Sequence, residues 1–268
     1  MQKTKYVHGY SGREALRLND QASTLEAIIH NDSVFADGSY VLEAGCGVGA
    51  QTKIIAAKNP MTKFISVDIS EESIIEARKS IGRMGFGNVE FMQADIHELP
   101  FEDSTFDSVF VCFVLEHLQH PTVALGELKR VLKKGGTIMV IEGDHGSTFF
   151  HPDSKYAQDA INCQIQLQKS NGGNSNIGRE LYPLLDSAGF SNIFVSPRMV
   201  YIDASKPLLV EGFIKNTFTA MIEGVKETAI EKELTDESLF DKGIKDLYRT
   251  AEQDGVFSYT FFKGFGEK

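Results

Sequence analysis

The chain has 268 residues, 42% of them apolar and 24% charged, which is typical of a globular protein with one large α/β domain, or one domain with insertions. Its net charge of −10, without clustered Lys and Arg, argues against nucleic acid as the main substrate. No apolar run approaches the roughly 20 residues needed to cross a bilayer, and the first residues lead into polar sequence. We therefore expect a cytoplasmic protein with no membrane segment.

Strand and helix patterns alternate through the first half of the chain. The predicted strands are Ser39–Glu43, Lys63–Asp68, Asn88–Met92, Phe106–Val114 and Thr137–Glu142. Helical patterns cover Asp20–Asn31, Gln51–Lys58, a segment capped by Ser70, and a segment from Pro121 to Lys134. Strands that are joined by helical crossovers predict a parallel, doubly wound sheet.

The pattern is less regular beyond Glu142. A polar stretch, Gly143–Asn176, contains a Gln-rich helical segment. The later predicted elements are helices at Glu180–Ala188, Leu208–Lys226 and Leu239–Gln253, and strands at Asn192–Ile202 and Val256–Phe265. Long connections above a parallel sheet are where binding residues collect, so we expect Gly143–Gly178 and Asp203–Gly255 to recognise the substrate.

The three cysteines, Cys46, Cys112 and Cys163, lie far apart and show no CxxC spacing. Neither a disulfide framework nor a zinc site is predicted. We expect all three to be small buried hydrophobic residues, and we expect no metal site.

A glycine-rich turn follows the first predicted strand. Gly45, Gly47 and Gly49 alternate directly after Glu43 and precede a helix. Such glycines let backbone N–H groups approach a ligand, and the positive end of the helix favours anionic groups. Glu43 adds a carboxylate at the edge of the sheet where ligands of α/β proteins bind. With Ala50, the turn also fits the G-x-G-x-x-G/A pattern of dinucleotide-binding proteins, which leaves an NAD(P)-dependent oxidoreductase open.

Two further carboxylates follow later strand ends. Asp68 ends the second strand and is placed to accept hydrogen bonds from the ribose hydroxyls of an adenosine, or it belongs to the cap region of the helix near Glu71. Asp95 is placed to accept from an adenine amino group while Ile96 packs on the ring, or it is an ordinary loop residue.

These residues resemble the class I S-adenosylmethionine-dependent methyltransferases, within which the chain is most similar to the small-molecule branch of ubiquinone and menaquinone biosynthesis methyltransferases. The similarity covers residues 39–142. Besides the glycine turn, Asp68 and Asp95-Ile96, it includes Leu99-Pro100-Phe101, Phe106-Asp107-Ser108-Val109, Leu115-Glu116-His117-Leu118 and Leu132-Lys133-Lys134-Gly135-Gly136. The resemblance implies a Rossmann-like, mostly parallel sheet of about seven strands with an antiparallel last strand and helical insertions.

The resemblance also implies S-adenosyl-L-methionine as the cofactor and a small-molecule methyl acceptor. The methionyl part of the cofactor would lie against Gly45, Cys46, Gly47 and Gly49, with the amino group near Glu43. The ribose would lie at Asp68 and Ile69, and the adenine at Asp95 and Ile96. The backbone around Phe113 would complete the pocket. The N-terminal stretch from Tyr10 to Gln21 resembles a cofactor-covering segment, which adds Tyr10, Arg17 and Gln21 as candidates.

We interpret the whole chain, 1–268, as one methyltransferase domain. Residues 1–38 would form a helical cover over the cofactor, residues 39–142 the cofactor-binding core, and residues 143–178 and 203–255 the insertions that bind the acceptor.

Methyl transfer from a sulfonium is an in-line displacement, so alignment of nucleophile, methyl and sulfur is the main contribution of the protein. A general base is needed only when the acceptor is protonated at neutral pH, and histidine is suited to that role. His117 follows the fourth strand and is the candidate base, or it holds the strand end by hydrogen bonds. His145, with Asp144 beside it, is a lesser candidate. A protein that binds an adenosyl ligand without transferring a methyl group is a third possibility.

Overall fold

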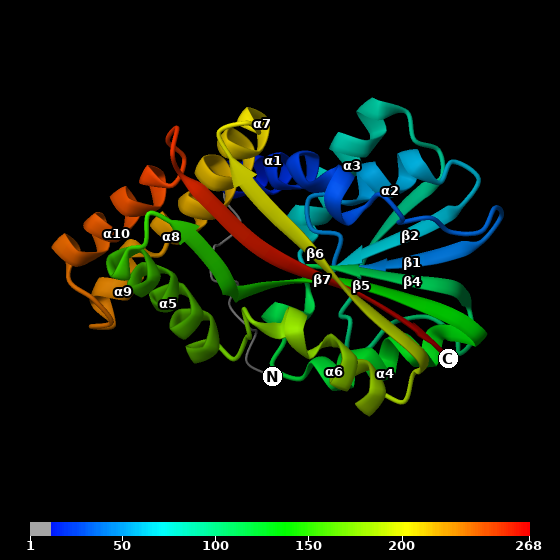
Figure 1. Ribbon diagram of the computed structural model, residues 1–268. Helices are drawn as coiled ribbons and strands as arrows, with labels where there is room; N and C mark the ends of the chain where they lie inside the picture. Colours follow the sequence, from blue (N-terminus) through cyan, green and yellow to red (C-terminus); the bar gives the residue numbers. More distant parts are fainter. Residues whose placement is uncertain (1–11) are drawn as a thin grey trace.

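A seven-stranded sheet runs through the computed structural model, which describes residues 12–268, with side chains from residue 17 onward (Figure 1). The strands are β1 (Tyr40–Ala44), β2 (Lys63–Asp68), β3 (Val89–Gln93), β4 (Phe106–Cys112), β5 (Leu132–His151), β6 (Ser191–Asp203) and β7 (Val256–Glu267). Their order is β3-β2-β1-β4-β5-β7-β6. β1 to β5 pair in parallel, whereas β7 is antiparallel to β5 and β6. This confirms the predicted Rossmann-like sheet with an antiparallel last strand.

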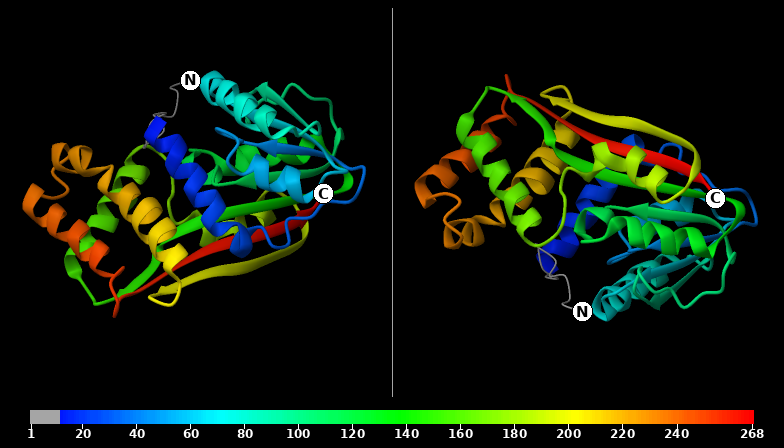
Figure 2. Two further views of the ribbon diagram at one scale, coloured as in Figure 1. Left: turned by 90° about the horizontal axis from the view of Figure 1, so that it is seen from above. Right: turned by 90° about the horizontal axis from the view of Figure 1, so that it is seen from below.

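Helices cover both faces of the sheet. In Figures 1 and 2, α1 (Gly12–Ile29), α2 (Thr52–Lys58) and α3 (Glu71–Met84) lie over one face, while α4 (Pro121–Val131) and α6 (Leu181–Ser187) lie over the other. Ser70 caps α3 as predicted, because its hydroxyl accepts a hydrogen bond from the Ser73 N–H. Two apolar cores fill the space between these helices and the sheet, one on each face.

A group of helices extends past the ends of β5 and β7. It contains α5 (Lys155–Ser170), α7 (Pro207–Leu209), η3 (Val210–Thr219), α8 (Ala220–Glu223), α9 (Lys226–Glu231) and α10 (Glu237–Arg249), and the short helices η1 (Leu115–His117) and η2 (Ile177–Glu180) lie closer to the sheet. The Ser154 hydroxyl, which caps α5, donates to Asp246 of α10 at 2.6 Å. None of the helices in residues 12–268 has the length and apolar character required to cross a membrane.

The fifth strand is longer than predicted. We expected it to end at Glu142, but it continues to His151 because residues 143–151 pair with β7. The pairing is irregular between Asp144 and Phe149, which redirects the strand. The predicted insertion 143–178 therefore begins as sheet. The local hydrophobic pattern does not predict this extension, because it depends on pairing with a strand more than one hundred residues away in the sequence.

Three predicted helices also differ from the structure. The helix predicted from Pro121 to Lys134 ends at Val131, because residues 132–134 already belong to β5, which begins before the predicted Thr137. α1 begins at Gly12, well before the predicted start at Asp20. The single helix expected over Leu208–Lys226 is divided, and its central part, η3, is a π-helix. The Thr217 hydroxyl in η3 donates to the carbonyl of Gly212, five residues earlier. Wider helical turns of this kind are rare and occur often at functional sites, because they change which side chains face a neighbour.

Candidate functional site

The glycine turn joins β1 to α2 in a left-handed backbone conformation. Gly45 has φ +78° and Gly47 has φ +51°, which favours residues without a Cβ. A Cβ on Gly45 would lie 2.4 Å from a methyl of Val114, so this glycine is required for packing against the loop after β4. A Cβ on Gly47 would meet no atom within 4 Å. Packing within the protein therefore explains the first glycine, whereas Gly47 leaves an approach to the backbone open.

Asp68 connects this turn to the loop after β2. Its Oδ2 accepts a hydrogen bond from the Gly47 N–H at 2.8 Å, and its Oδ1 accepts from the Ser70 N–H at 2.9 Å. Burial raises the pKa of its carboxyl despite these bonds. Asp68 therefore holds the cap residue Ser70, as one interpretation of the sequence expected, and it also contacts the glycine turn. Each carboxylate oxygen has a second lone pair that can accept from a ligand hydroxyl. The adjacent Ile69 is 54% exposed.

Glu43 lies beneath the turn, and its carboxyl is almost fully buried. Its Oε2 accepts hydrogen bonds from the hydroxyls of Thr52 at 2.7 Å and Ser66 at 2.6 Å. Burial raises the pKa of Glu43 to about 7. Burial also raises the pKa of the neighbouring Cys46 thiol, which keeps it neutral, as expected for a small buried residue.

We expect the difference in free energy of unfolding between Glu43→Gln and the unsubstituted protein to change with pH. It should shift in favour of the variant as pH rises from 4.5 toward 8. A carboxyl whose pKa is raised on folding contributes stability at low pH and loses it as pH rises through the folded value, here about 7. The amide cannot ionise but still offers an oxygen to Thr52 and Ser66. Urea unfolding of both proteins across this range measures the difference. Two parallel stability curves would contradict the raised pKa, because contributions of the other groups cancel in the comparison.

Asp95 and Ile96 lie in the loop after β3. Asp95 Oδ1 accepts hydrogen bonds from the backbone N–H of His97 and lies 2.9 Å from His97 Nδ1, while Ile96 is buried. The His97 contact lowers the pKa of the Asp95 carboxyl against the opposing effect of burial. The carboxylate is thereby held in its charged form beside the carboxyl ends of the parallel strands. We had no role for His97 from the sequence.

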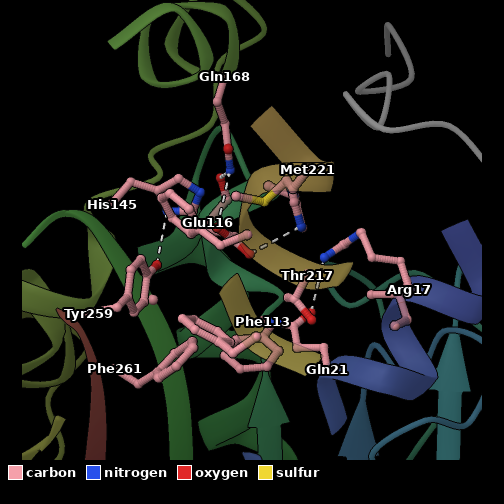
Figure 3. A pocket seen from close by; sticks show the side chains of 15 residues that line it. Arg17, Gln21, Phe113, Glu116, His145, Gln168, Thr217, Met221, Tyr259 and Phe261 are labelled. Atoms are coloured by element: carbon pink, nitrogen blue, oxygen red, sulfur yellow. Dashed lines mark hydrogen bonds and ion pairs between the residues drawn. The ribbon is translucent and has the colours of Figure 1, made fainter. Parts of the chain in front are cut away.

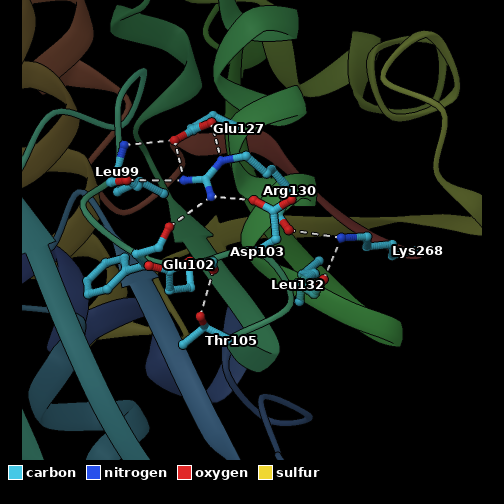
Figure 4. A network of polar contacts seen from close by, with 9 residues as sticks. Leu99, Glu102, Asp103, Thr105, Glu127, Arg130, Leu132 and Lys268 are labelled. Carbon is cyan, nitrogen blue, oxygen red and sulfur yellow. Dashed lines mark hydrogen bonds and ion pairs between the residues drawn. The ribbon is translucent and has the colours of Figure 1, made fainter.

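A polar network holds the rest of this loop against α4 (Figure 4). Arg130 donates hydrogen bonds to the carbonyl oxygens of Leu99 and Phe101 and to the carboxylates of Glu127 and Asp103. Glu127 also accepts from the Leu99 N–H at 2.8 Å. The guanidinium therefore fixes the position of a loop that has little regular structure of its own.

Phe113 follows β4 and lines a cavity of the protein. Its φ is +58°, which is uncommon for a residue with a side chain. Its N–H donates to the Ile141 carbonyl at 2.9 Å, and its ring centre lies 5.4 Å from that of Phe261. The unusual backbone angle turns the chain away from β4 and presents the ring to the cavity.

This cavity has a volume of about 60 Å³ and lies between α1, η3, the end of β4 and the inner parts of β5 and β7 (Figure 3). We call it the distal pocket. Its lining consists of Arg17, Leu18, Gln21, Phe113, Glu116, His117, Gly143, His145, Gln168, Phe213, Thr217, Phe218, Met221, Tyr259 and Phe261. The structure thus brings together the predicted residues Arg17, Gln21, Phe113 and His117. Tyr10 lies outside the described residues.

α1 forms one side of this pocket and is anchored at its far end. Arg17 Nη1 donates to Gln21 Oε1 at 3.2 Å. At the end of the helix, the fully buried Lys263 of β7 donates to the Ile29 carbonyl at 3.2 Å and to Asp32 Oδ1 at 2.6 Å. The helix predicted to cover the cofactor is therefore attached to the sheet at its end far from the pocket.

His117 also lines the distal pocket. Its Nε2 is 3.5 Å from Glu116 Oε1, and Gln168 donates to the Glu116 carbonyl at 3.0 Å. Glu116 belonged to a motif in the sequence but had no role assigned to it. Glu116 thus lies between His117 and Gln168 in the lining of the pocket.

Glu142, at the end of the predicted fifth strand, is a residue that the sequence reasoning missed. Its Oε1 accepts from the N–H groups of Val114 at 2.9 Å and Leu115 at 2.7 Å, so it shapes the loop after β4. Burial, followed by the nearby Glu116, raises the pKa of its carboxyl far above the ordinary value. Its position in the sequence could have indicated it, because Glu142 ends its predicted strand as Glu43 and Asp68 end theirs.

A family model described as a methyltransferase domain matches residues 36–189, more than half of the chain. The chain belongs to the methyltransferase domain family. The resemblance expected from residues 39–142 is confirmed. An uncharacterised 37.1 kDa protein in a transposon of Streptomyces fradiae is 33% identical over 76% of this chain and 61% of its own length.

Other methyltransferases match smaller parts or the fold alone. A ubiquinone/menaquinone biosynthesis C-methyltransferase of Pseudomonas fluorescens is 38% identical over 39% of this chain and 42% of its own. The matched region thus spans less than two thirds of either relative. A solved phosphoethanolamine N-methyltransferase 2 of Haemonchus contortus, in complex with S-adenosylhomocysteine, shares the fold with a TM-score of 0.60 and 17% identity, over 96% of this chain and 58% of its own.

Proposed function

We propose that the protein is an S-adenosylmethionine-dependent methyltransferase whose acceptor is a small molecule bound in the distal pocket. The observation that carries the proposal is the pairing of Gly47 with Asp68. A left-handed glycine leaves its Cβ direction open, and its N–H is held by a carboxylate at the end of the neighbouring strand. Membership of the methyltransferase domain family supports the same conclusion.

The residues at this edge of the sheet offer hydrogen-bond acceptors that suit the donor groups of the cofactor. When bound, S-adenosylmethionine would supply a methyl group carried by a sulfonium. The turn from Gly45 to Gly49, with Cys46 and Glu43, would hold its methionyl part, while Asp68 and Ile69 would contact the ribose and Asp95 and Ile96 the adenine. The carboxylates of Asp68 and Asp95 are acceptors, and the groups they would contact are hydroxyl and amino donors.

The distal pocket suits an acceptor placed in line with that methyl group. Phe113 lies at the boundary of the two regions, and the aromatic side chains that line the pocket exclude water from the reacting atoms. Arg17 and Gln21 of α1 would close the pocket beside the cofactor. Orientation of this kind supplies on the order of 7–11 kcal/mol of the barrier reduction in well-aligned reactions. His117, beside Glu116, would accept a proton from an acceptor that must lose one.

Calorimetric titration with S-adenosylhomocysteine, and separately with NAD, tests the proposal. We expect saturable binding of S-adenosylhomocysteine alone at micromolar concentration. Binding of NAD alone would overturn the proposal in favour of an oxidoreductase. Binding of S-adenosylhomocysteine with no turnover on any of a broad set of small acceptors would favour the adenosyl-ligand-binding protein without transfer activity.

A further inference from the structure

His145 is the buried residue of the distal pocket whose two ring nitrogens have contrasting surroundings (Figure 3). It is 5% exposed. Its Nδ1 lies 3.0 Å from the Tyr259 hydroxyl, whereas its Nε2 is buried and has no hydrogen-bond partner among the described residues. Because a buried polar atom without a partner is costly, native proteins pair nearly all of them. The unpaired Nε2 therefore points to a ligand.

We propose that His145 donates a hydrogen bond from Nε2–H to an oxygen atom of the methyl acceptor, and that Tyr259 is the positioning residue that sets the imidazole tautomer. This inference rests on the proposed function, since it takes the distal pocket as the acceptor site.

The surroundings of Tyr259 determine which way the shared hydrogen bond runs. The phenol is buried, and burial raises its pKa well above the ordinary value, so it keeps its proton. Among the described residues, His145 Nδ1 is the partner within hydrogen-bond distance of the phenol oxygen, and a buried O–H without an acceptor is costly. The phenol O–H is therefore directed at His145 Nδ1, which accepts it.

A neutral imidazole that accepts at Nδ1 carries its proton on Nε2. Burial lowers the pKa of His145, which keeps the ring neutral although Glu116, Asp144 and the Ser175 backbone oppose this effect; Arg17 adds to it. Asp144 is itself paired with Arg179, with 2.7 Å between its Oδ1 and the guanidinium Nη2. His145 therefore presents a donor to the pocket and takes no proton from the acceptor, a role that complements that of His117.

The remaining lining indicates the chemical class of the acceptor. Five aromatic side chains form apolar walls, namely Phe113, Phe213, Phe218, Tyr259 and Phe261. A protonated amine would bring its own hydrogens against the Nε2–H, while an oxygen atom offers a lone pair to it. Glu116, the carboxylate in the lining, is already in contact with Gln168 and His117. We therefore infer an apolar acceptor, such as a flat ring, that carries a hydroxyl, enol or carbonyl oxygen.

The tautomer can be measured without knowledge of the acceptor. In protein labelled with ¹⁵N-histidine, long-range ¹H–¹⁵N correlation spectra distinguish the two neutral tautomers, and the His145→Gln variant identifies the signals of His145 by their loss. We expect the Nε2–H tautomer in the unsubstituted protein and a mixture of tautomers in Tyr259→Phe. A dominant Nδ1–H tautomer, or spectra unchanged by Tyr259→Phe, would overturn the assignment. This result does not depend on cofactor binding.

Binding of a small phenol tests whether His145 donates a hydrogen bond to an oxygen atom of a ligand. 4-Nitrophenol is titrated into the protein loaded with S-adenosylhomocysteine, with 4-nitrobenzylamine as the matched cationic probe. We expect 4-nitrophenol to bind more tightly than the amine. We also expect His145→Leu to weaken its binding about 3- to 10-fold, the effect of one lost hydrogen bond. His145→Gln, which retains an N–H donor, should remain close to the unsubstituted protein.

Tighter binding of the amine, no binding of 4-nitrophenol, or equal affinity in His145→Leu would overturn the inference. Affinity for S-adenosylhomocysteine is measured in every variant, and it should not change, which shows that the variants are folded. If the unsubstituted protein itself does not bind S-adenosylhomocysteine, the proposed function is refuted instead.

Discussion

The Gly45→Ala variant is expected to lose about 2–5 kcal/mol of its free energy of unfolding. A left-handed conformation costs a residue with a Cβ roughly 1–2 kcal/mol. The new Cβ would also lie 2.4 Å from a methyl of Val114, and overpacking of this kind costs about 1–3 kcal/mol. Urea unfolding measures the loss.

Gly47→Ala is the matched control, because its φ is also positive but its Cβ would meet no protein atom within 4 Å. We expect it to lose only about 1–2 kcal/mol of stability, from the backbone conformation alone. It should nevertheless weaken S-adenosylhomocysteine binding strongly, since the Cβ would occupy the side that we assign to the ligand. Equal stability losses in the two variants would contradict the packing role of Gly45, and unchanged affinity in Gly47→Ala would contradict the proposed site.

The Asp68→Ala variant is expected to bind S-adenosylhomocysteine more weakly by about 1–3 kcal/mol, roughly 5- to 150-fold in dissociation constant. The variant would lose the proposed contact with the ribose and would also release the Gly47 N–H, which its Oδ2 holds at 2.8 Å. Calorimetry on the purified variant measures the change in affinity.

Asp107→Ala provides the control for this experiment. Asp107 also accepts a backbone hydrogen bond, from Tyr40 at 2.9 Å, but it lies near the opposite ends of the strands. The two variants should therefore share a loss of stability, and only Asp68→Ala should lose affinity. If both variants retain the affinity of the unsubstituted protein, Asp68 does not belong to the site.

Local chemistry explains which parts of the fold were predictable. The strand Lys63–Asp68 has the bounds expected from its apolar run, and the Ser70 cap lies where a serine before acidic residues indicates it. The glycine turn was likewise visible, because its glycines and the strand before it are adjacent in sequence. All three features depend on residues close to one another along the chain.

The distal pocket was less predictable because its parts come from distant segments. Gln168, Tyr259 and Phe213 line it together although they belong to α5, β7 and η3. Nothing in the sequence near His145 indicates that Tyr259, 114 residues later, bonds to its ring. Such contacts arise from strand pairing across the sheet, which propensity and periodicity do not encode.

The long strands β5 and β7 have a mechanical consequence. β5 runs from Leu132 to His151 and pairs with β7 both beside the parallel strands and beside the helical group around α5 and α10. The pairing is regular from Thr137 to Asp144, so the spacing between the glycine turn and His145, the next residue, is set by the sheet. For the proposed methyltransferase, helices attached to this frame could then change their side chains, and with them the preferred acceptor, while the position of the transferred methyl group stays constant.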